Sequence, residues 1–377
     1  MRMAVLAHSL RVAGGRSVGQ SLTSALVETA PQHEYLWVVP AGAGYELPDS
    51  RHGDRLVEVP ALSLPKRLVF EMAQLPRLVK AFRPDWVWGL NNVGLSNPPC
   101  RQAVLFQDSH LVYPQRHFAL ETRWYKFRKG LVKRRLRASL PKTDVVFCQT
   151  RTAKRRFVEE FGFTGEVALC PNAVSPLSTR RGSGRTPPLL EPYAGRFKML
   201  CLAKYCAHKN FEGIVETYAR HRESLAETVV ALTIAPDQHP LAGAVIDRIR
   251  REGLEDLLLP VGAIPQQELA DWFGQVNAVL FPTLLESFSG TYLEAMHFGV
   301  PILTSDLDFA HDVCDDAALY FDPWNPEAME QAILALAADP GRQAKLVQAG
   351  KERLASMFRS WNDVVREALD VMGVDHQ

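Results

Sequence analysis

Short apolar runs alternate with longer amphipathic segments along most of the chain. Runs rich in Val, Leu and Phe are typical of buried parallel strands, and the segments between them have the period of crossover helices. The first series predicts strands over 3–7, 35–39, 86–89, 103–107 and 145–149. A second series predicts strands over 198–203, 229–235, 257–261, 278–281 and 301–304. The pattern therefore predicts two α/β domains of the same class.

The segment between the two series, residues 175–195, reads SPLSTRRGSGRTPPLLEPYAG and has no periodic apolar face. A composition dense in Pro, Gly, Ser and Arg is typical of an interdomain connection. We expect an N-terminal domain over 1–180, a linker over 181–195 and a C-terminal domain over 196–358. A further amphipathic helix over 361–372, in the segment 359–377, has two open placements, one of them back on the N-terminal domain.

The composition is consistent with two hydrophobic cores and indicates little else about the function. The chain has 377 residues, of which 47% are hydrophobic, and a net charge of +1. That length suits two domains, and the near-zero charge gives no global reason to expect nucleic acid as a partner. The six cysteines form no CxxC pair, which favours buried reduced thiols. No signal-peptide pattern and no run of about 20 apolar residues is found, so we expect a cytoplasmic protein that is soluble or peripherally attached to a membrane.

The most informative segment, 286–301, reads ESFSGTYLEAMHFGVP. Seven residues separate Glu286 from Glu294, and Ser289, Gly290 and Thr291 between them can open a helix with unpaired amides. Such amides attract phosphate, whereas carboxylates accept hydrogen bonds from sugar and ribose hydroxyls. One element could therefore hold both halves of a nucleotide sugar. The alternative is that both acids are solvated helix residues.

The longer run PTLLESFSGTYLEAMHFGVPILTS resembles the donor-binding signature of family 4 glycosyltransferases, which are retaining enzymes of the GT-B fold. ALCPNAVSP resembles the family's Pro-Asn-Gly-Val segment, with Ala173 where glycine is commoner, and VGAIPQQELADWFGQVNAVLFPT resembles the stretch before the glutamates. The resemblance is strongest over 144–323. It implies two Rossmann-like, doubly wound domains that face a central cleft. It also implies that Glu286 and the amides of Phe288 to Thr291 hold the donor sugar, and that Glu294 holds the ribose.

Two lysines follow the first strand of the second series, in LAKYCAHKNFEGIVETY. Lys204 and Lys209 could neutralise a departing diphosphate in place of a divalent cation, and taken alone they could equally be surface lysines. Similar enzymes bind the diphosphate with an Arg or Lys and a Lys at this spacing. Lysine at 204 keeps the charge of the commoner arginine without its bidentate fork. We therefore expect no metal and no cofactor beyond the donor.

Two segments of the first domain are candidates for contacts with the reacting groups. Gly14 and Gly15 follow the first strand, in HSLRVAGGRSVGQS, and are either a glycine turn near the donor phosphates, as in the family, or a plain strand-to-helix turn. Asp108 and His110 follow another strand, in LFQDSHLVYP, at the edge where α/β sheets bind ligands. Either of the two could hold or deprotonate the acceptor hydroxyl. A solvated turn is the alternative.

One strongly basic segment, 123–137, reads RWYKFRKGLVKRRLR and contains no acid. A peripheral membrane patch, a solvated helix face and, more weakly, nucleic acid binding are the open interpretations. We favour docking to an anionic membrane, where a lipid-linked acceptor would be found. The basic residues of this candidate patch are Arg123, Lys126, Arg128, Lys129, Lys133, Arg134, Arg135 and Arg137.

Together, these features predict a metal-independent retaining glycosyltransferase that moves a hexose-type sugar from a nucleotide-sugar donor to a glycan or lipid-linked acceptor. Surface polysaccharide or lipopolysaccharide assembly is the expected setting. The candidate catalytic residues are Lys204, Lys209, Glu286, Asp108 and His110. The rival hypotheses are a nucleotide-sugar epimerase or phosphorylase on the same scaffold, and a non-catalytic nucleotide-sugar-binding module.

Overall fold

The chain folds into two compact units, each built on a parallel sheet. The computed structural model describes residues 1–11, 13–45, 47, 53–174, 182–357 and 359–376. Unit 1 comprises Met1–Tyr113, Thr122–Ala173 and Arg359–Gln377, and unit 2 comprises Pro114–Glu121 and Val174–Phe358. Part of the predicted linker region, 175–181, lies outside the described residues. The short segment 114–121, which the sequence-based division assigned to the N-terminal domain, groups with unit 2.

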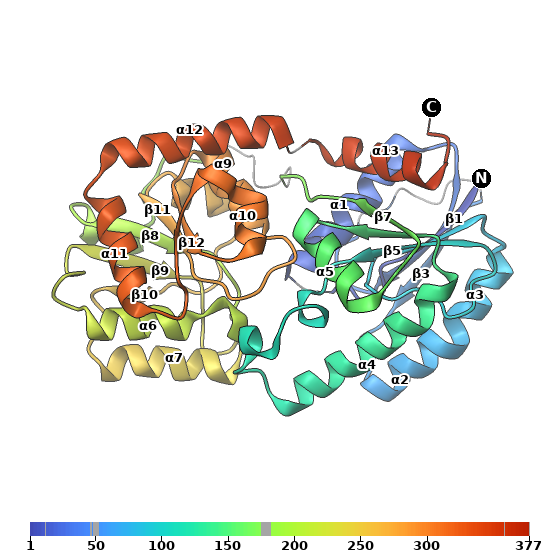
Figure 1. Ribbon diagram of the computed structural model, residues 1–377, viewed down its shortest axis with the longest axis horizontal. Helices are drawn as coiled ribbons and strands as arrows, with labels where there is room; N and C mark the ends of the chain where they lie inside the picture. Colours follow the sequence, from blue (N-terminus) through green and yellow to red (C-terminus); the bar gives the residue numbers. More distant parts are fainter. Residues whose placement is uncertain (12, 46, 48–52, 175–181, 358, 377) are drawn as a thin grey trace. The chain divides into compact units, whose positions relative to one another are not determined.

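Unit 1 contains a seven-stranded sheet in the order β3-β2-β1-β4-β5-β6-β7, and every neighbouring pair is parallel (Figure 1). The order reverses direction between β1 and β4, as it does in doubly wound nucleotide-binding folds. The strands are β1 (Arg2–Leu6), β2 (Glu34–Pro40), β3 (Arg55–Val59), β4 (Trp86–Gly89), β5 (Arg101–Phe106), β6 (Val145–Cys148) and β7 (Glu166–Leu169).

Helices cover both faces of this sheet because successive strand residues point to opposite sides. Met3 and Val5 of β1 pack in one core with α1 and α13, whereas Ala4 and Leu6 pack in another with η1 and α3. A third core lies between β5, β6, α4 and α5. The helices are α1 (Ala13–Thr29), α2 (Leu64–Val69), the π-helix η1 (Phe70–Gln74), α3 (Leu75–Phe82), α4 (Arg123–Ser139), α5 (Arg151–Phe161) and α13 (Trp361–Met372), with 3-10 turns η2 (Ser109–Leu111) and η4 (Leu140–Lys142).

Unit 2 repeats the architecture with a six-stranded parallel sheet in the order β10-β9-β8-β11-β12-β13. Helices α6, α7 and α11 pack on one face, and α9 lies on the other, where the Tyr292 hydroxyl is 2.8 Å from Oγ1 of Thr304 in β12. The strands are β8 (Phe197–Cys201), β9 (Thr228–Leu232), β10 (Leu258–Pro260), β11 (Ala278–Phe281), β12 (Ile302–Ser305) and β13 (Ala318–Phe321).

The helices of unit 2 are joined to its strands by short loops. They are α6 (Phe211–Arg220), α7 (Pro240–Arg251), α8 (Leu269–Phe273), α9 (Gly290–Phe298), α10 (Asp308–Cys314), α11 (Pro326–Ala337) and α12 (Pro340–Met357). The 3-10 turns are η3 (Gln115–Phe118), η5 (Pro188–Tyr193), η6 (Ala207–Lys209), η7 (Gln266–Glu268) and η8 (Asp315–Ala317). No helix within the described ranges is long and apolar enough to cross a bilayer.

The predicted α/β class with two doubly wound sheets is confirmed, and all ten predicted strands are present within a few residues. Three strands, β3, β7 and β13, were not predicted. One local prediction is wrong. The segment with Gly14 and Gly15 is not an open glycine turn, because α1 begins at Ala13 and both glycines lie in its first turn.

Candidate functional site

The predicted donor residues gather at the carboxyl ends of two neighbouring strands of unit 2. Lys204 lies exposed in the loop after β8, and Lys209 is the last residue of η6 in the same connection. Glu286 lies in the loop after β11, which pairs directly with β8. The carboxyl ends of parallel strands are where open α/β sheets bind ligands. The sheet order therefore places a basic loop and an acidic loop side by side.

Lys209 and Glu286 form an ion pair across these two loops. The Lys209 ammonium donates to Oε1 of Glu286, and the Thr283 hydroxyl donates to the same oxygen at 3.1 Å. The two charged side chains are only 16% and 11% exposed, and the ammonium lies 4.6 Å from the centroid of the Phe281 ring. A charge-assisted bond in such a shielded place is stronger than one at the surface. The pair therefore fixes an ammonium and a carboxylate at one point.

Backbone contacts hold the two loops in register. The amide of Leu284 donates to the His208 carbonyl at 2.7 Å, and the Thr283 hydroxyl contacts the same carbonyl at 3.2 Å. The Thr291 hydroxyl, in the first turn of α9, donates to the Leu202 carbonyl at 3.3 Å. The positions of the two loops are thus set by the sheet itself rather than by long side chains.

Helix α9 presents its amino-terminal end next to this pair. Its N-cap residue Ser289 makes no side-chain capping bond, and Gly290 is exposed. Phe288 and Ser289 are buried, and Glu294 is half-buried within the helix. Because the first amides of a helix have no partner inside the helix, this end suits the oxygens of an anionic group.

A cavity of about 400 Å³ lies along the same edge of the sheet, beyond β8. It is formed after β9 by Ile234, Ala235 and Pro236, at the end of β10 by Pro260, Val261 and Gly262, and by Ile246, Ile249 and Arg250 of α7 together with Glu255. This cavity could not be predicted from the sequence, because most of its wall is ordinary apolar residues and backbone. Strands lie about 4.8 Å apart, so the edge from β10 to β11 spans roughly 14 Å.

In unit 1, Asp108 and His110 belong to one buried cluster at the end of β5. Nδ1 of His110 donates to Oδ1 of Asp108 at 3.1 Å, and the Lys129 ammonium donates to Oδ2 at 2.5 Å. The Tyr125 hydroxyl lies 3.4 Å from Nε2 of His110. Asp108 thereby fixes the proton of His110 on Nδ1.

This cluster strongly stabilises the ionised form of Asp108. Burial alone would raise its pKa, but the Lys129 ammonium and the hydrogen bond from His110 outweigh that effect and hold the pKa well below its usual range. The same contact raises the pKa of Lys129 despite its burial. Asp108 is therefore an orienting carboxylate and a poor proton acceptor at neutral pH.

Half of the predicted basic patch on α4 is paired with acids from other elements. Lys129 contacts Asp108, Arg135 contacts Glu71, and both Lys133 and Arg137 contact Glu160. The segment has no acid of its own, so the sequence could not show this neutralisation. The exposed part of the helix is narrower, and it carries Arg123, Trp124, Phe127, Arg128 and Arg134.

A second buried charged cluster in unit 1 was not predicted. Glu71 of η1 is 3% exposed and accepts hydrogen bonds from His8 at 3.0 Å, from Arg67 at 2.8 Å and from Arg135. In the sequence, Arg67 and Glu71 look like an ordinary surface pair one helical turn apart. In the sequence, only the position of His8, which interrupts the apolar run of the first strand, indicated this cluster.

Comparisons with known proteins agree with this architecture. Residues 196–339 match the model of a family described as Glycosyl transferases group 1. A D-inositol 3-phosphate glycosyltransferase of Xylanimonas cellulosilytica is 31% identical over 121 residues, which are 32% of this chain and 28% of that protein. The O-antigen chain mannosyltransferase B of Escherichia coli is 21% identical over 288 residues, covering 71% and 73% of the two chains. The chain thus spans less than a third of the first relative's length.

Solved structures resemble the whole chain. The sucrose-phosphate synthase of Thermosynechococcus elongatus superposes with a TM-score of 0.77 at 16% identity, covering 99% of this chain and 98% of that one. Anabaena HepE in complex with UDP-glucose gives a TM-score of 0.74 at 12% identity, with 99% of both chains covered. Such identities show the fold alone. The chain therefore has the GT-B fold, and its segment 196–339 is similar to the group 1 glycosyl transferases.

Proposed function

We propose that the protein is a retaining glycosyltransferase that moves a hexose-type sugar from a nucleotide-sugar donor to a glycan or lipid-linked acceptor without a metal ion. The observation that carries the proposal is the ion pair of Lys209 and Glu286, set between adjacent strand ends beside the open end of α9. The family match over 196–339 covers all of these residues. The UDP-glucose complex of HepE and the name of the O-antigen mannosyltransferase support the donor class and the kind of acceptor.

The donor would lie along the carboxyl edge of the unit 2 sheet. The cavity after β9 and β10 would take the base, and Glu294 would take the ribose hydroxyls. Lys204, Lys209 and the first amides of α9 would hold the diphosphate, and Glu286 would accept hydrogen bonds from the sugar. A span of roughly 14 Å along four strand ends suits an extended nucleotide sugar.

The chemistry follows from charge development at the leaving group. As the bond between the anomeric carbon and the diphosphate oxygen breaks, negative charge grows on that oxygen, and fixed ammonium groups stabilise it. The acceptor hydroxyl forms the new bond on the same face and gives its proton to the departing phosphate oxygen. The anomeric configuration is then retained. In unit 1, His110 would contact the acceptor hydroxyl while Asp108 orients its ring.

Product analysis tests this proposal. We expect sugar transfer from one nucleotide-sugar series in EDTA, with the new bond in the anomeric configuration of the donor by NMR. An inverted product, or activity that returns only with added divalent cation, would contradict the mechanism. Donor conversion without any acceptor would favour an epimerase, dependence on inorganic phosphate would favour a phosphorylase, and nucleotide binding without turnover would favour a binding module.

We further propose that the exposed stripe of α4 docks on an anionic membrane. Trp124 and Phe127 are 58% and 55% exposed and stack at 5.5 Å between Arg123 and Arg128. Aromatic rings at such a surface enter the headgroup region, and each basic residue near anionic lipid contributes about 1 kcal/mol.

Liposome co-sedimentation tests the membrane proposal. Replacing Trp124 and Phe127 by serine is expected to reduce binding to vesicles with anionic lipid at least tenfold, and raised salt should weaken binding of the unaltered protein. Leu56→Ser, at a 56% exposed residue of β3, is the control and should bind normally. Equal binding to neutral and anionic vesicles would contradict the proposal, as would a double variant that binds normally.

A further inference from the structure

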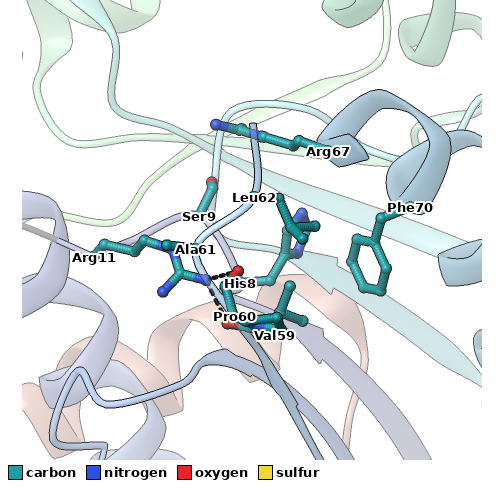
Figure 2. A pocket seen from close by; sticks show the side chains of 9 residues that line it. All are labelled: His8, Ser9, Arg11, Val59, Pro60, Ala61, Leu62, Arg67 and Phe70. Carbon is teal, nitrogen blue, oxygen red and sulfur yellow. Dashed lines mark hydrogen bonds between the residues drawn. The ribbon is translucent and has the colours of Figure 1, made fainter. Parts of the chain in front are cut away.

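A cavity of about 110 Å³ in unit 1 lies at the carboxyl ends of β1 and β3 (Figure 2). Its walls come from the turn after β1, from the segment after β3, and from α2 and η1. The residues are His8, Ser9, Arg11, Val59, Pro60, Ala61, Leu62, Arg67 and Phe70. A water molecule occupies about 30 Å³ of liquid, so the cavity has room for a group of a few non-hydrogen atoms.

The cavity is positively charged. Arg11 and Arg67 line it, and none of the described residues that line it is acidic. The carboxylate that contacts His8 and Arg67, Glu71, does not line the cavity and accepts hydrogen bonds from Arg67 and Arg135. Burial would raise the pKa of Glu71, but its bonds with His8 and the two arginines hold it well below the usual range. Two guanidinium groups thus share the single charge of Glu71, and Arg11 contacts only backbone carbonyls, which leaves an excess of positive charge.

Both arginines that line the cavity have N–H groups without a hydrogen-bond partner among the described residues. Arg11 bonds the carbonyls of Ala41, Val59 and Pro60, which uses three of its five N–H groups. Arg67 uses its Nε–H on Glu71, and its two terminal nitrogens have no hydrogen-bond partner among the described residues. The arginines are therefore positioned by the protein and still able to bind an anion.

His8 gives an independent sign of a ligand. It is 4% exposed, and its Nε2 donates to Glu71, while its Nδ1 is buried and has no hydrogen-bond partner in the described part of the chain. An unpaired buried nitrogen costs free energy unless something binds it. The π-helix η1 buries two successive side chains that contact His8: the ring centroids of Phe70 and His8 are 5.5 Å apart, and Glu71 accepts the hydrogen bond from Nε2. Single π-turns often occur at functional sites.

We propose that this cavity binds a phosphate group of the acceptor, so that the proposed glycosyltransferase uses a phosphorylated sugar or a lipid phosphate rather than a neutral glycan. The identification of the phosphate as part of the acceptor rests on the proposed function, whereas the phosphate-binding site itself does not. Two guanidinium groups and the Ser9 hydroxyl offer donors from several directions. Nδ1 of His8, which is an acceptor while Nε2–H bonds Glu71, can accept the P–O–H of a phosphate monoester, a proton that a carboxylate lacks at neutral pH. This set suits a tetrahedral phosphate better than a planar carboxylate.

Calorimetric titration of the full chain tests the site directly. The probes are glucose 6-phosphate, D-glucose, glucuronate, and vesicles of equal negative charge that contain either phosphatidic acid or phosphatidylserine, since α4 is itself proposed to bind anionic vesicles. We expect glucose 6-phosphate or phosphatidic acid vesicles to bind, D-glucose and glucuronate to bind at least tenfold more weakly, and Arg11→Gln and Arg67→Lys each to weaken phosphate binding at least tenfold. Arg77→Gln, at an exposed residue of α3, is the matched control and should bind normally. Binding of the soluble ester identifies a sugar phosphate. Tighter binding of the phosphatidic acid vesicles than of the phosphatidylserine vesicles, lost in Arg11→Gln, identifies a lipid phosphate.

The thermal shift produced by nucleotide distinguishes failure of this inference from failure of the proposed function. It should be the same in Arg11→Gln and in the unaltered protein, which also shows that the variant folds. The inference is overturned if phosphate probes bind the variants as tightly as the unaltered chain, if the uncharged sugar binds equally well, or if neither phosphate probe binds. Sugar transfer that persists in any of these cases would leave the proposed function standing.

Discussion

Replacing Lys209 by alanine is expected to lower kcat for sugar transfer on the order of 10²–10³-fold, the usual effect of removing one fixed donor to a developing anion. The ammonium is fixed by Glu286 in a shielded place, so no other side chain can take over its position without moving. The same variant should lose most of the thermal shift that the nucleotide donor gives in EDTA. Steady-state kinetics and a melting series measure both effects.

Lys345→Ala is the matched control for this prediction, because Lys345 is an exposed lysine of α12 in the same unit. It should leave both readouts unchanged. Lys209→Arg should retain part of the activity, since the charge remains while its geometry changes. A Lys209→Ala enzyme with normal kcat and a normal thermal shift would show that the ion pair is only structural.

Replacing Lys129 by alanine is expected to cost roughly 3 kcal/mol of unfolding free energy, at the low end for breaking a buried pair because Lys129 keeps some exposure to solvent. The change leaves the carboxylate of Asp108, which is 11% exposed, without its ammonium partner. Arg128→Ala, the neighbouring substitution at an exposed position of α4, should change stability by less than about 0.5 kcal/mol. Urea unfolding at neutral pH compares the variants.

The pH dependence identifies the cause of that loss. The pKa of Asp108 is depressed in the folded state, so its contribution to stability is present above the unfolded pKa of about 4 and is lost as the pH falls through the lower folded pKa. The difference between the unaltered protein and Lys129→Ala should therefore be largest at neutral pH and shrink in acid. A difference that stays constant down to low pH would mean that lost packing, not charge, explains the effect.

The strands inside each sheet could be predicted from the sequence, whereas of the four edge strands only β10 was predicted. β1, β4 and β11 are buried on both faces, so they form unbroken apolar runs. β3, β7 and β13 all lie at sheet edges, and each is only partly buried because solvent reaches part of the strand. The sequence pattern is mixed in β3, whereas β13 reads ALYF and is too short a run to distinguish from a buried helical segment. The sequence RLVEV of β3, for example, alternates charged and apolar residues without a continuous run.

Candidate site residues could be predicted where they lie close together in the sequence. Their partners could not be predicted where segments that are distant in the sequence meet. Glu286 and Glu294 lie in a loop and in the following helix, as their spacing suggested. The partnership of Lys209 with Glu286 depends on β8 and β11 being neighbours, which is a property of sheet order. The acids that neutralise α4 likewise come from other elements, and Glu71 lies 64 residues before Arg135, so it could not be recognised as its partner.

The segment 114–121 has a consequence for engineering. Its neighbours on both sides along the chain belong to unit 1, but it packs within unit 2, where Nδ1 of His117 donates to the Leu284 carbonyl at 2.6 Å, two residues before Glu286. The last helix, α13, conversely belongs to unit 1 although unit 2 precedes it. Neither unit is therefore encoded by one continuous stretch of gene. A chimera that exchanges donor specificity with a related enzyme must transplant 114–121 together with 174–358 and leave the final helix behind, since a single crossover would separate His117 from the loop that it supports.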